Sequence, residues 1–331
     1  MDWSTILSNS ARSAIGLETV IYALAAIGLN VQFGYAGLLN FGQAAFVAVG
    51  AYGIAITVTV AGLPFWLGIV VGLLGAVLLA LLLGIPTLRL RADYLAIATI
   101  AAAEIVRLVF RSATLREYTG GSGGLSGFAE AFYDLSPLDP GRSYGFGPWV
   151  FGSRLTWILV VGWALVALSC VLVYLLMRSP WGRVLRGIRE DEDAVRSLGK
   201  NVYAYKMQAL VIGGVIGALA GFTFGVGRAS VQPDLYGTEL TFFVYTVLLL
   251  GGAARVLGPV VGAAIFWVVL VLTENVLIQA VGAGYIPSSI MSTTQVGQVR
   301  FMLVGLALML LMIFRPQGIF GDRRELAIDA R

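Results

Sequence analysis

Long apolar stretches separated by short polar segments run through almost the whole chain. We predict a membrane-spanning helix in each stretch, because roughly 20 apolar residues in helical form cross a ~30 Å hydrocarbon layer. Alternating segments of about ten residues, typical of a transmembrane β-barrel, are absent from the sequence. The expected fold is an all-α integral membrane protein, a polytopic helical bundle that forms a single transmembrane domain over residues 1–331. We expect about nine spans (range about 8–10) near residues 15–33, 36–60, 65–85, 94–110, 155–177, 207–227, 238–254, 259–280 and 298–314.

The composition supports this fold class and excludes several kinds of functional site. Of the 331 residues, 58% are hydrophobic and only 12% are charged, and the mean hydropathy is +0.87. The chain has no histidine, which removes histidine-based catalysis and most metal-site patterns, so we predict no metal site. Its single cysteine, Cys170, has no partner for an intrachain disulfide. The net charge of +4 is attributed to basic cytoplasmic loops rather than to nucleic-acid binding.

The polar segment 178–206 is both strongly charged and regularly patterned. It holds seven of the 22 Lys and Arg residues and four consecutive acids. Ser179-Pro180 indicates a helix start, with proline at the first helical position. Acids in the first turn and Gly199 after the last turn predict a second short helix. The first helix is expected to turn Arg183 and Arg186 away from one apolar stripe, which is formed by Trp181, Val184, Leu185 and Ile188.

The distribution of basic residues predicts the orientation in the membrane. Segment 178–206 is expected in the cytoplasm, since basic residues gather in cytoplasmic loops. Segment 111–154, with four basic and four acidic residues, is expected to be an extracytoplasmic loop with a flexible glycine cluster at 120–124. The N-terminus lies outside if 36–60 crosses once, and inside if 36–60 folds back. Alternation places on the cytoplasmic side Arg89, Arg91, Arg255 and the tail residues Arg315, Arg323, Arg324 and Arg331.

Three polar residues inside predicted spans are candidates for a translocation path. Asn40 and Gln43 are costly facing lipid, so they either line a path or bond across tightly packed helices. Glu104 either forms an ion pair with Arg107, three residues later, or contributes a polar wall to the path. Both alternatives remain open for each residue at the level of sequence.

The sequence contains no complete enzyme motif. Gly199-Lys200-Asn201 is similar to the end of a phosphate-binding loop. However, the earlier glycine, the following Ser or Thr and the preceding strand of such a loop are absent. We therefore expect that this chain is not an enzyme, binds no cofactor and does not hydrolyse ATP.

Three segments together resemble the permeases of branched-chain amino acid ABC uptake systems, specifically the LivM-like family. They are GYAGLLNFGQAAFVAVGAY at 34–52, SPWGRVLRGIREDEDAVRSLGKNVYAYK at 179–206 and LLGGAARVLGPVVGA at 249–263. The resemblance covers most of 25–320. It implies a homologous second permease (LivH-like), two ABC ATPase subunits that bind ATP and magnesium, and an extracytoplasmic substrate-binding protein. It also implies a multi-pass location in the bacterial inner membrane.

The same resemblance assigns segment 178–206 to ATPase coupling. The import-permease motif Glu-Ala-Ala, three residues, then Gly maps onto Asp193-Ala194-Val195 and Gly199, with Asp for Glu and Val for the second Ala. The usual downstream Ile-x-Leu-Pro is missing around Ala209 to Ile212. The residues expected to couple to the ATPases are Arg189, Glu192, Asp193, Ala194, Val195 and Gly199.

The expected function is therefore the permease subunit of an ABC importer that provides the path for branched-chain amino acids. The first alternative keeps the machinery and changes the cargo to urea, short amides or other small solutes. The second is an ion-coupled secondary transporter or a channel. That class usually needs several ion-coordinating polar groups near the membrane midplane, and this chain offers few.

Overall fold

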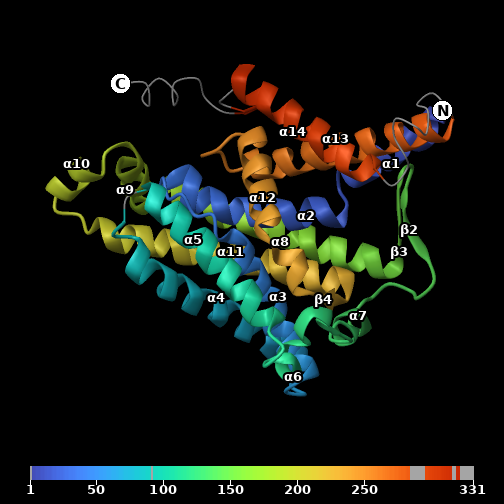
Figure 1. Cartoon of the computed structure of the whole chain (residues 1–331), viewed down its shortest axis with the longest axis horizontal. Helices are drawn as coiled ribbons and strands as arrows, with labels where there is room; N and C mark the ends of the chain where they lie inside the picture. The colour runs from blue at the N-terminus through green and yellow to red at the C-terminus, as the bar shows by residue number, and fades with distance from the viewer. Residues whose placement is uncertain (1, 91, 284–294, 315–317, 321–331) are drawn as a thin grey trace.

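The computed structural model describes residues 2–90, 92–283, 295–314 and 318–320, and most of them are helical (Figure 1). The helices are α1 (Trp3–Ser13), α2 (Leu17–Leu29), α3 (Gln43–Thr59), α4 (Phe65–Thr87), α5 (Ala92–Arg111), α6 (Arg116–Thr119), α7 (Glu130–Asp134), α8 (Ser153–Arg178), α9 (Pro180–Glu190), α10 (Glu192–Ser197), α11 (Val202–Arg228), α12 (Thr238–Gly251), α13 (Gly258–Gly282) and α14 (Val296–Phe314). A π-helix, η1 (Asn30–Tyr35), continues α2, and two 3-10 helices are η2 (Gly121–Gly123) and η3 (Pro233–Tyr236). The antiparallel strand pairs are β1 (Leu125–Ser126) with β4 (Ser230–Val231) and β2 (Ser143–Phe146) with β3 (Trp149–Gly152). The predicted all-α class is confirmed.

Every predicted span contains a described helix. Among the described residues, five helical segments are long and apolar enough to cross a membrane: Trp3–Tyr35, α4, α8, α11 and α13. Two further apolar helices are shorter, α3 with 17 residues and α12 with 14. At about 1.5 Å per residue, α12 covers about 21 Å, which is less than a ~30 Å hydrocarbon layer. Its mostly buried residues show that the bundle, rather than lipid, surrounds it.

The centre of the bundle is the packing of α11 against α2 and α3. Glycine and alanine let these backbones touch. A Cβ added at Gly221 would lie 2.0 Å from the Val47 carbonyl oxygen, and one at Gly50 would lie 2.2 Å from the Ala218 carbonyl oxygen. Small residues at such contacts are typical of helix association in membranes, where close approach maximises van der Waals contact. α4, α8, α12 and α13 each pack against at least one of these three helices.

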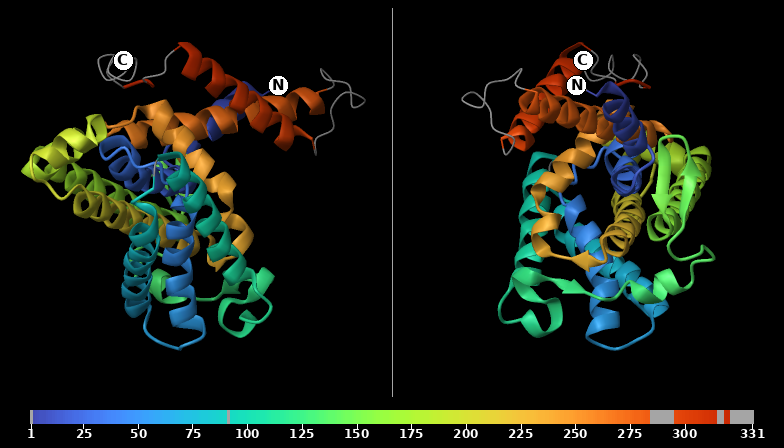
Figure 2. Two further views of the ribbon diagram at one scale, coloured as in Figure 1. Left: turned by 60° about the vertical axis from the view of Figure 1, so that its left-hand side comes forward. Right: turned by 90° about the vertical axis from the view of Figure 1, so that its right-hand side faces the viewer.

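The two ends of the bundle carry different connections. α9 and α10 form one end, and α1 with the β2–β3 hairpin lies at the other (Figure 1). The Trp149 indole of the hairpin donates a hydrogen bond to the Ala11 carbonyl of α1 at 2.8 Å. α13 lies beside α1 and α14, as Figure 2 shows from two further directions. α1 and the hairpin part of segment 111–154 therefore share an end, as expected if 36–60 crosses the membrane once.

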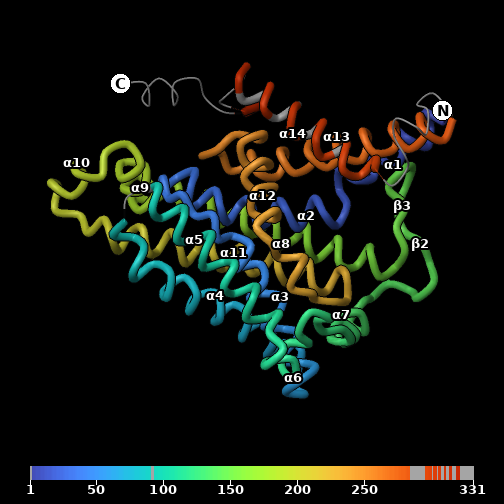
Figure 3. The backbone as a smooth tube through the Cα atoms, in the orientation of Figure 1, coloured from blue at the N-terminus to red at the C-terminus, as the bar shows by residue number. Residues whose placement is uncertain are grey.

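Two predicted span boundaries are wrong. The span expected over 36–60 begins as a helix only at Gln43, because residues 36–42 are non-helical after η1 (Figure 3). The span expected to end before Pro86 continues to Thr87. Pro86 has no amide hydrogen to donate to the Leu82 carbonyl, and the helix ends one residue after it. The first error matters for function, since it places an interruption between the first two spans.

The glycine cluster at 120–124 is an ordered turn rather than a flexible loop. Gly120 and Gly124 have φ values of 75° and 73°, which glycine adopts readily. The turn leads into β1, which pairs with β4 and joins the α5–α8 connection to the α11–α12 connection. A Cβ at Gly124 would lie 1.8 Å from the Val231 carbonyl oxygen, so the strand contact itself requires glycine. The cluster ties two connections together at one end of the bundle.

Some predicted features lie outside the described residues. They are the basic residues Arg91, Arg315, Arg323, Arg324 and Arg331 and most of the connection between α13 and α14.

Gly221→Ala is expected to destabilise the fold. The added Cβ meets the α3 backbone, which cannot move away as a side chain can, so overpacking should cost about 1–3 kcal/mol or more. Thermal unfolding of the purified protein in detergent measures the effect. Gly282→Ala is the matched control, because a Cβ at Gly282 meets no atom within 4 Å. Equal unfolding temperatures for the two variants would contradict the described backbone contact.

Candidate functional site

The connection between α8 and α11 is a pair of capped helices, α9 and α10. Asp191 separates them, and its carboxylate accepts a hydrogen bond from the Ala194 amide at 2.9 Å and caps α10. Gly199 follows α10 with φ of 74°, the left-handed conformation typical of a helix C-terminus. Ser179 occupies the N-cap position of α9, but its hydroxyl donates to the Leu176 carbonyl instead. Both predicted helices are confirmed, whereas the sequence did not identify Asp191 as a cap.

The predicted apolar stripe of α9 faces the bundle. Leu185 and Ile188 are 0% and 4% exposed, and Trp181 and Val184 are half-buried beside them. Arg183 and Arg186 lie on the exposed face, as expected. Burial of the stripe holds α9 against the spans and leaves a basic face for other contacts.

Two contacts make the attachment of α9 rigid. At the corner between α8 and α9, a Cβ on Gly182 would lie 2.5 Å from the Met177 Cα, so the two backbones touch. The Trp181 indole donates a hydrogen bond to the Gln208 side chain of α11 at 2.7 Å. α9 is therefore fastened both to the helix before the pair and to the helix after it.

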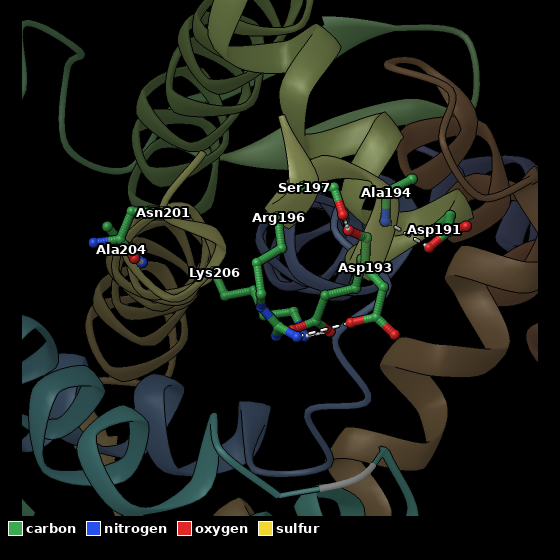
Figure 4. A network of polar contacts seen from close by, with 9 residues as sticks. Asp191, Asp193, Ala194, Arg196, Ser197, Asn201, Ala204 and Lys206 are labelled. Atoms are coloured by element: carbon green, nitrogen blue, oxygen red, sulfur yellow. Dashed lines mark hydrogen bonds and ion pairs between the residues drawn. The ribbon is translucent and has the colours of Figure 1, made fainter. Parts of the chain in front are cut away.

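Ion pairs orient α10 (Figure 4). Arg196 contacts Glu192 at 2.9 Å and Asp193 at 2.7 Å, and Lys206 of α11 also pairs with Glu192. Exposed pairs of this kind contribute little to stability, about 0–1 kcal/mol. Their effect is to fix the orientation of α10. Lys206, whose side chain is only 15% exposed, links α10 to α11. Asp193 remains 88% exposed on the outer face.

A polar groove of about 710 Å³ lies between α10, the end of α4 and the start of α11. Arg89 and Lys200 contribute positive charge to it, and the Arg89 guanidinium lies 5.9 Å from the centre of the Tyr203 ring. The helix pair and this groove together form one charged surface at the end of the bundle.

The predicted coupling residues face two directions. Arg189, in the last turn of α9, points towards the bundle, and its Nη1 donates to the Gly34 carbonyl at 2.6 Å. Val195 is 9% exposed and lies under α9 close to Gly187. The residues on α10 or directly after it are Glu192, Asp193, Ala194, Val195 and Gly199. The structure brings these residues together, and their role in coupling stays a prediction.

Residues 30–42, which we call the α2–α3 interruption, comprise η1 and the non-helical stretch before α3. Side-chain amides hold it in place. Gln32 Nε2 donates to the Leu210 carbonyl of α11 at 3.1 Å, and Gln32 Oε1 accepts from Asn40 Nδ2 at 2.7 Å. Asn40 Oδ1 in turn accepts from the Gly42 amide at 2.8 Å. These bonds satisfy polar groups that are fully buried in the bundle.

Further amide contacts connect the interruption to α12 and to the α12–α13 turn. Asn30 accepts a hydrogen bond from the Ala254 amide and donates one to the Arg255 carbonyl, both at 2.8 Å. The Tyr245 hydroxyl of α12 donates to the Asn40 carbonyl at 3.1 Å. Sequence reasoning selected Asn40 and missed Asn30 and its neighbour Gln32. The signal in the sequence was that Asn30 and Gln32 are two amide side chains within an otherwise apolar stretch, which indicates buried hydrogen bonds.

Gln43 opens α3 and is fully buried. Its Nε2 donates to the Ala25 carbonyl of α2 at 3.1 Å and contacts the Gly213 carbonyl of α11 at 3.5 Å. Its Oε1 accepts no hydrogen bond from the described residues. The contacts of Asn40 and Gln43 in this conformation are those of helix packing, and a role in the path stays a prediction.

Glu104 forms the predicted ion pair with Arg107, at 2.5 Å. Arg107 also contacts Asp234 of η3 at 2.6 Å, and Arg111 contacts the same carboxylate at 3.3 Å. The sequence did not indicate Asp234, because it lies 127 positions from Arg107. The cluster joins α5 to the α11–α12 connection, and the Glu104 side chain remains 38% exposed.

The arrangement is suited to binding and movement rather than to covalent chemistry. Within the described ranges, no group of three Cys, Asp or Glu residues is placed to hold a metal ion. A charged helix pair at one end of a multi-helix membrane bundle, connected to an interrupted span, defines the class of multi-pass membrane permeases.

The comparisons with known proteins agree with this class and identify the family. Residues 13–313 match the family described as branched-chain amino acid transport system / permease component. The chain is 32% identical to the high-affinity branched-chain amino acid transport system permease protein LivM of Salmonella typhimurium, over 96% of this chain and 71% of that protein. The chain therefore belongs to the family of branched-chain amino acid transport system permease components. It is a permease subunit and not an enzyme, a multi-pass protein of the inner membrane.

Two further relatives bear on the partners. The chain is 28% identical to the probable branched-chain amino acid transport permease protein LivM of Methanocaldococcus jannaschii, over 92% of this chain and 91% of that protein. It is also 26% identical to the permease protein LivH of Salmonella typhimurium, over 91% of both chains. Similarity to both LivM and LivH indicates a transport system with two related permease subunits.

Asn40→Ala is expected to destabilise the α2–α3 interruption. It removes the bonds to Gln32 and Gly42 and leaves buried polar groups without partners, which costs about 1–3 kcal/mol. Chemical or thermal unfolding in detergent measures the loss. Asn9→Ala, which removes an exposed amide from α1, is the control and should unfold like the wild type. An unchanged unfolding midpoint for Asn40→Ala would show that the buried amide bonds contribute nothing to stability.

Proposed function

We propose that this chain is the LivM-like half of an ATP-driven importer of branched-chain amino acids. In this proposal, a homologous LivH-like permease completes the membrane unit, and an extracytoplasmic binding protein delivers the amino acid. Two ABC ATPase subunits, which bind ATP and magnesium, dock on segment 178–206 in the cytoplasm. The observation that carries the proposal is the helix pair itself: α9 and α10 are rigidly fastened to α8 and α11 and present a charged outer face.

The geometry of the helix pair supports docking. Short amphipathic helices with capped ends are suited to binding in a groove of a partner protein. Leu198, directly after α10, is an apolar side chain that is 78% exposed at the end of the bundle. In the sequence it lies between Asp193, whose carboxylate is 88% exposed, and Lys200, which lines the charged groove. An exposed apolar residue surrounded by charges is the arrangement typical of the centre and rim of a binding interface.

Coupling requires that movement at this surface reaches the spans. A flexible loop would absorb a displacement, whereas α9 and α10 are held by backbone contact, a buried stripe and an ion pair to α11. Closure of two docked ATPases would therefore move α8 and α11 together with the helix pair. α11 is also the helix at the centre of the bundle, so its displacement changes the contacts of α2 and α3.

The proposed path runs along α5 and the α2–α3 interruption. Glu104 is partly exposed on the outside of this chain, and a carboxylate at membrane depth is costly against lipid. The exposed face of α5 therefore fits against the second permease, with Glu104 on a polar wall between the two subunits. Asn40 and Gln43, at the start of α3, would contribute when the interruption moves. The cargo rests on the named activities of the relatives, with urea and short amides as the alternative.

Uptake of radiolabelled leucine into proteoliposomes tests the function directly. The reconstituted complex should accumulate leucine only with internal ATP and the leucine-loaded binding protein, and both permeases should copurify with the ATPases. Competition by excess urea or acetamide tests the alternative cargo. Leucine uptake by this chain alone, without ATP, would identify a secondary transporter and end the proposal.

Two variants of α10 test the docking surface in the same assay. Asp193→Lys reverses an exposed charge, and Gly199→Pro cannot adopt the φ of 74° that ends α10. Both should leave membrane insertion intact and abolish leucine-stimulated ATP hydrolysis. Asp139→Lys is the matched control, since Asp139 forms a similar exposed pair with Arg142, three residues away, in the α5–α8 connection. Normal stimulation in both α10 variants would show that this surface does not couple the ATPases.

Gln43→Leu tests the path. Leucine preserves the size and removes the polar group, so uptake should fall about tenfold or more if Gln43 meets the cargo, since an unpaired polar group costs about 1–3 kcal/mol. Gln298→Leu, at an exposed position of α14, is the control. Unchanged uptake at unchanged protein level would assign Gln43 to helix packing alone.

A further inference from the structure

Arg189 connects two parts of the chain that the sequence keeps far apart. It lies in the last turn of α9, and its Nη1 donates a hydrogen bond to the Gly34 carbonyl at 2.6 Å, across 155 positions. The neighbouring Arg186 guanidinium lies 5.8 Å from the centre of the Tyr35 ring. Both contacts reach the α2–α3 interruption at the end of η1. The helix pair therefore touches the α2–α3 interruption directly, in addition to its attachment to α8 and α11.

The end of η1 is built to receive this arginine. The last carbonyls of a helix lack partners within the helix, and a basic side chain can satisfy them. A bond from a charged donor is roughly twice as strong as one between neutral groups. Gly37 lies against the same side chain: its φ is 68°, and a Cβ there would approach the Arg189 Cγ to 3.3 Å. Gly34 and Gly37, at the end of η1 and in the turn after it, therefore both contact the Arg189 side chain.

Gly34, whose carbonyl accepts the Arg189 bond, also packs against residues that contact other helices. A Cβ at Gly34 would lie 2.0 Å from the Asn30 Oδ1 and 2.7 Å from the Ala254 amide nitrogen, so Gly34 fits tightly against both. Asn30 is hydrogen-bonded to the α12–α13 turn, and Gln32 is hydrogen-bonded to α11. A displacement of Gly34 cannot occur without a change in these contacts.

We propose that Arg189 is the link through which movement of the helix pair reaches the α2–α3 interruption and resets α3 against α2 and α11. The inference rests on the proposed ATP-driven import and adds a named route to it. A continuous helix resists bending because each residue is held by the hydrogen-bond ladder. The interruption lacks that ladder over residues 36–42 and is held by side-chain amides, so it bends at lower cost. Arg189 is a positioning residue in this scheme, and it acts through the backbone of η1.

The alternative is that the Arg189 bond only holds α9 in place. The two roles differ in what is lost with the side chain. A purely structural bond predicts loss of stability or of subunit assembly. A link predicts an assembled complex in which the helix pair still responds to nucleotide and the interruption no longer does.

Hydrogen exchange on the full reconstituted complex, measured by mass spectrometry, separates these outcomes. Exchange is compared between the nucleotide-free state and the state trapped with ATP and vanadate, for peptides covering 34–42 and 180–199. In the wild type both peptides should change. In Arg189→Ala the change at 180–199 should remain and the change at 34–42 should disappear. Arg189→Lys, which keeps one charged donor, should restore part of the response.

ATP hydrolysis with the leucine-loaded binding protein gives the second readout. The ratio of stimulated to basal hydrolysis should fall at least about fivefold in Arg189→Ala, the lower end of typical coupling between sites. Arg142→Ala is the control, because Arg142 directly precedes the β2–β3 hairpin, outside the proposed docking surface, and its side chain is 74% exposed in an ion pair with Asp139. This control should retain the wild-type ratio and both exchange responses.

Three results would overturn the link. One is a wild-type peptide 34–42 that does not respond to nucleotide, and another is a response that persists in Arg189→Ala. The third is failure of both Arg189 variants to assemble while Arg142→Ala assembles, which would leave only a structural role. A wild-type complex that hydrolyses ATP without leucine stimulation would instead contradict the proposed function, and the exchange comparison would still decide the link.

Discussion

Backbone groups buried in a membrane protein have no water to bond with, so every break in a helix must be satisfied by the protein itself. The α2–α3 interruption is where this constraint is met by side chains. Asn30, Gln32 and Asn40 supply the amide groups that a continuous helix would have supplied from its own backbone. Because these bonds reach α11, α12 and the α12–α13 turn, the same groups that make the break tolerable also connect it to the helices around it.

The second constraint is the close packing of α11, which leaves little freedom at the centre of the bundle. Backbone contact at Gly221 and Gly50 holds α3 closely against α11, so α3 moves as a rigid element and does not bend at these contacts. Movement is therefore concentrated at positions where the chain is not helical. The interruption is one such position, and the helix pair at the end of α8 contacts it through Arg189. The close packing of α11 keeps the centre of the bundle rigid, and the α2–α3 interruption is where the chain can bend.

The sequence predicted those features that depend on hydrophobic periodicity and on the residues at helix ends, because both act within a few positions. The stripe of α9, its proline start and the glycine after α10 are set by neighbours within a few residues, and all three are present in the structure. The start of α3 was mispredicted because residues 36–42, apart from Asn40, are apolar residues and glycine, and composition alone does not distinguish a buried turn from a helix. The partners of Asn30 and Arg107 were not predictable either, since they lie 224 and 127 positions away along the chain.

The amino-acid sequence by itself determined that this chain is a helical membrane bundle with a charged, capped helix pair, because hydrocarbon thickness and helix-end chemistry act on contiguous residues. Its three characteristic segments also carried the resemblance to its family. The tertiary structure alone decided that Arg189 bonds to the Gly34 carbonyl at the end of η1, and that Asn40 and Gln43 are packed between helices. These contacts depend on how α2, α3, α9 and α11 pack together, and a local sequence pattern does not predict such packing.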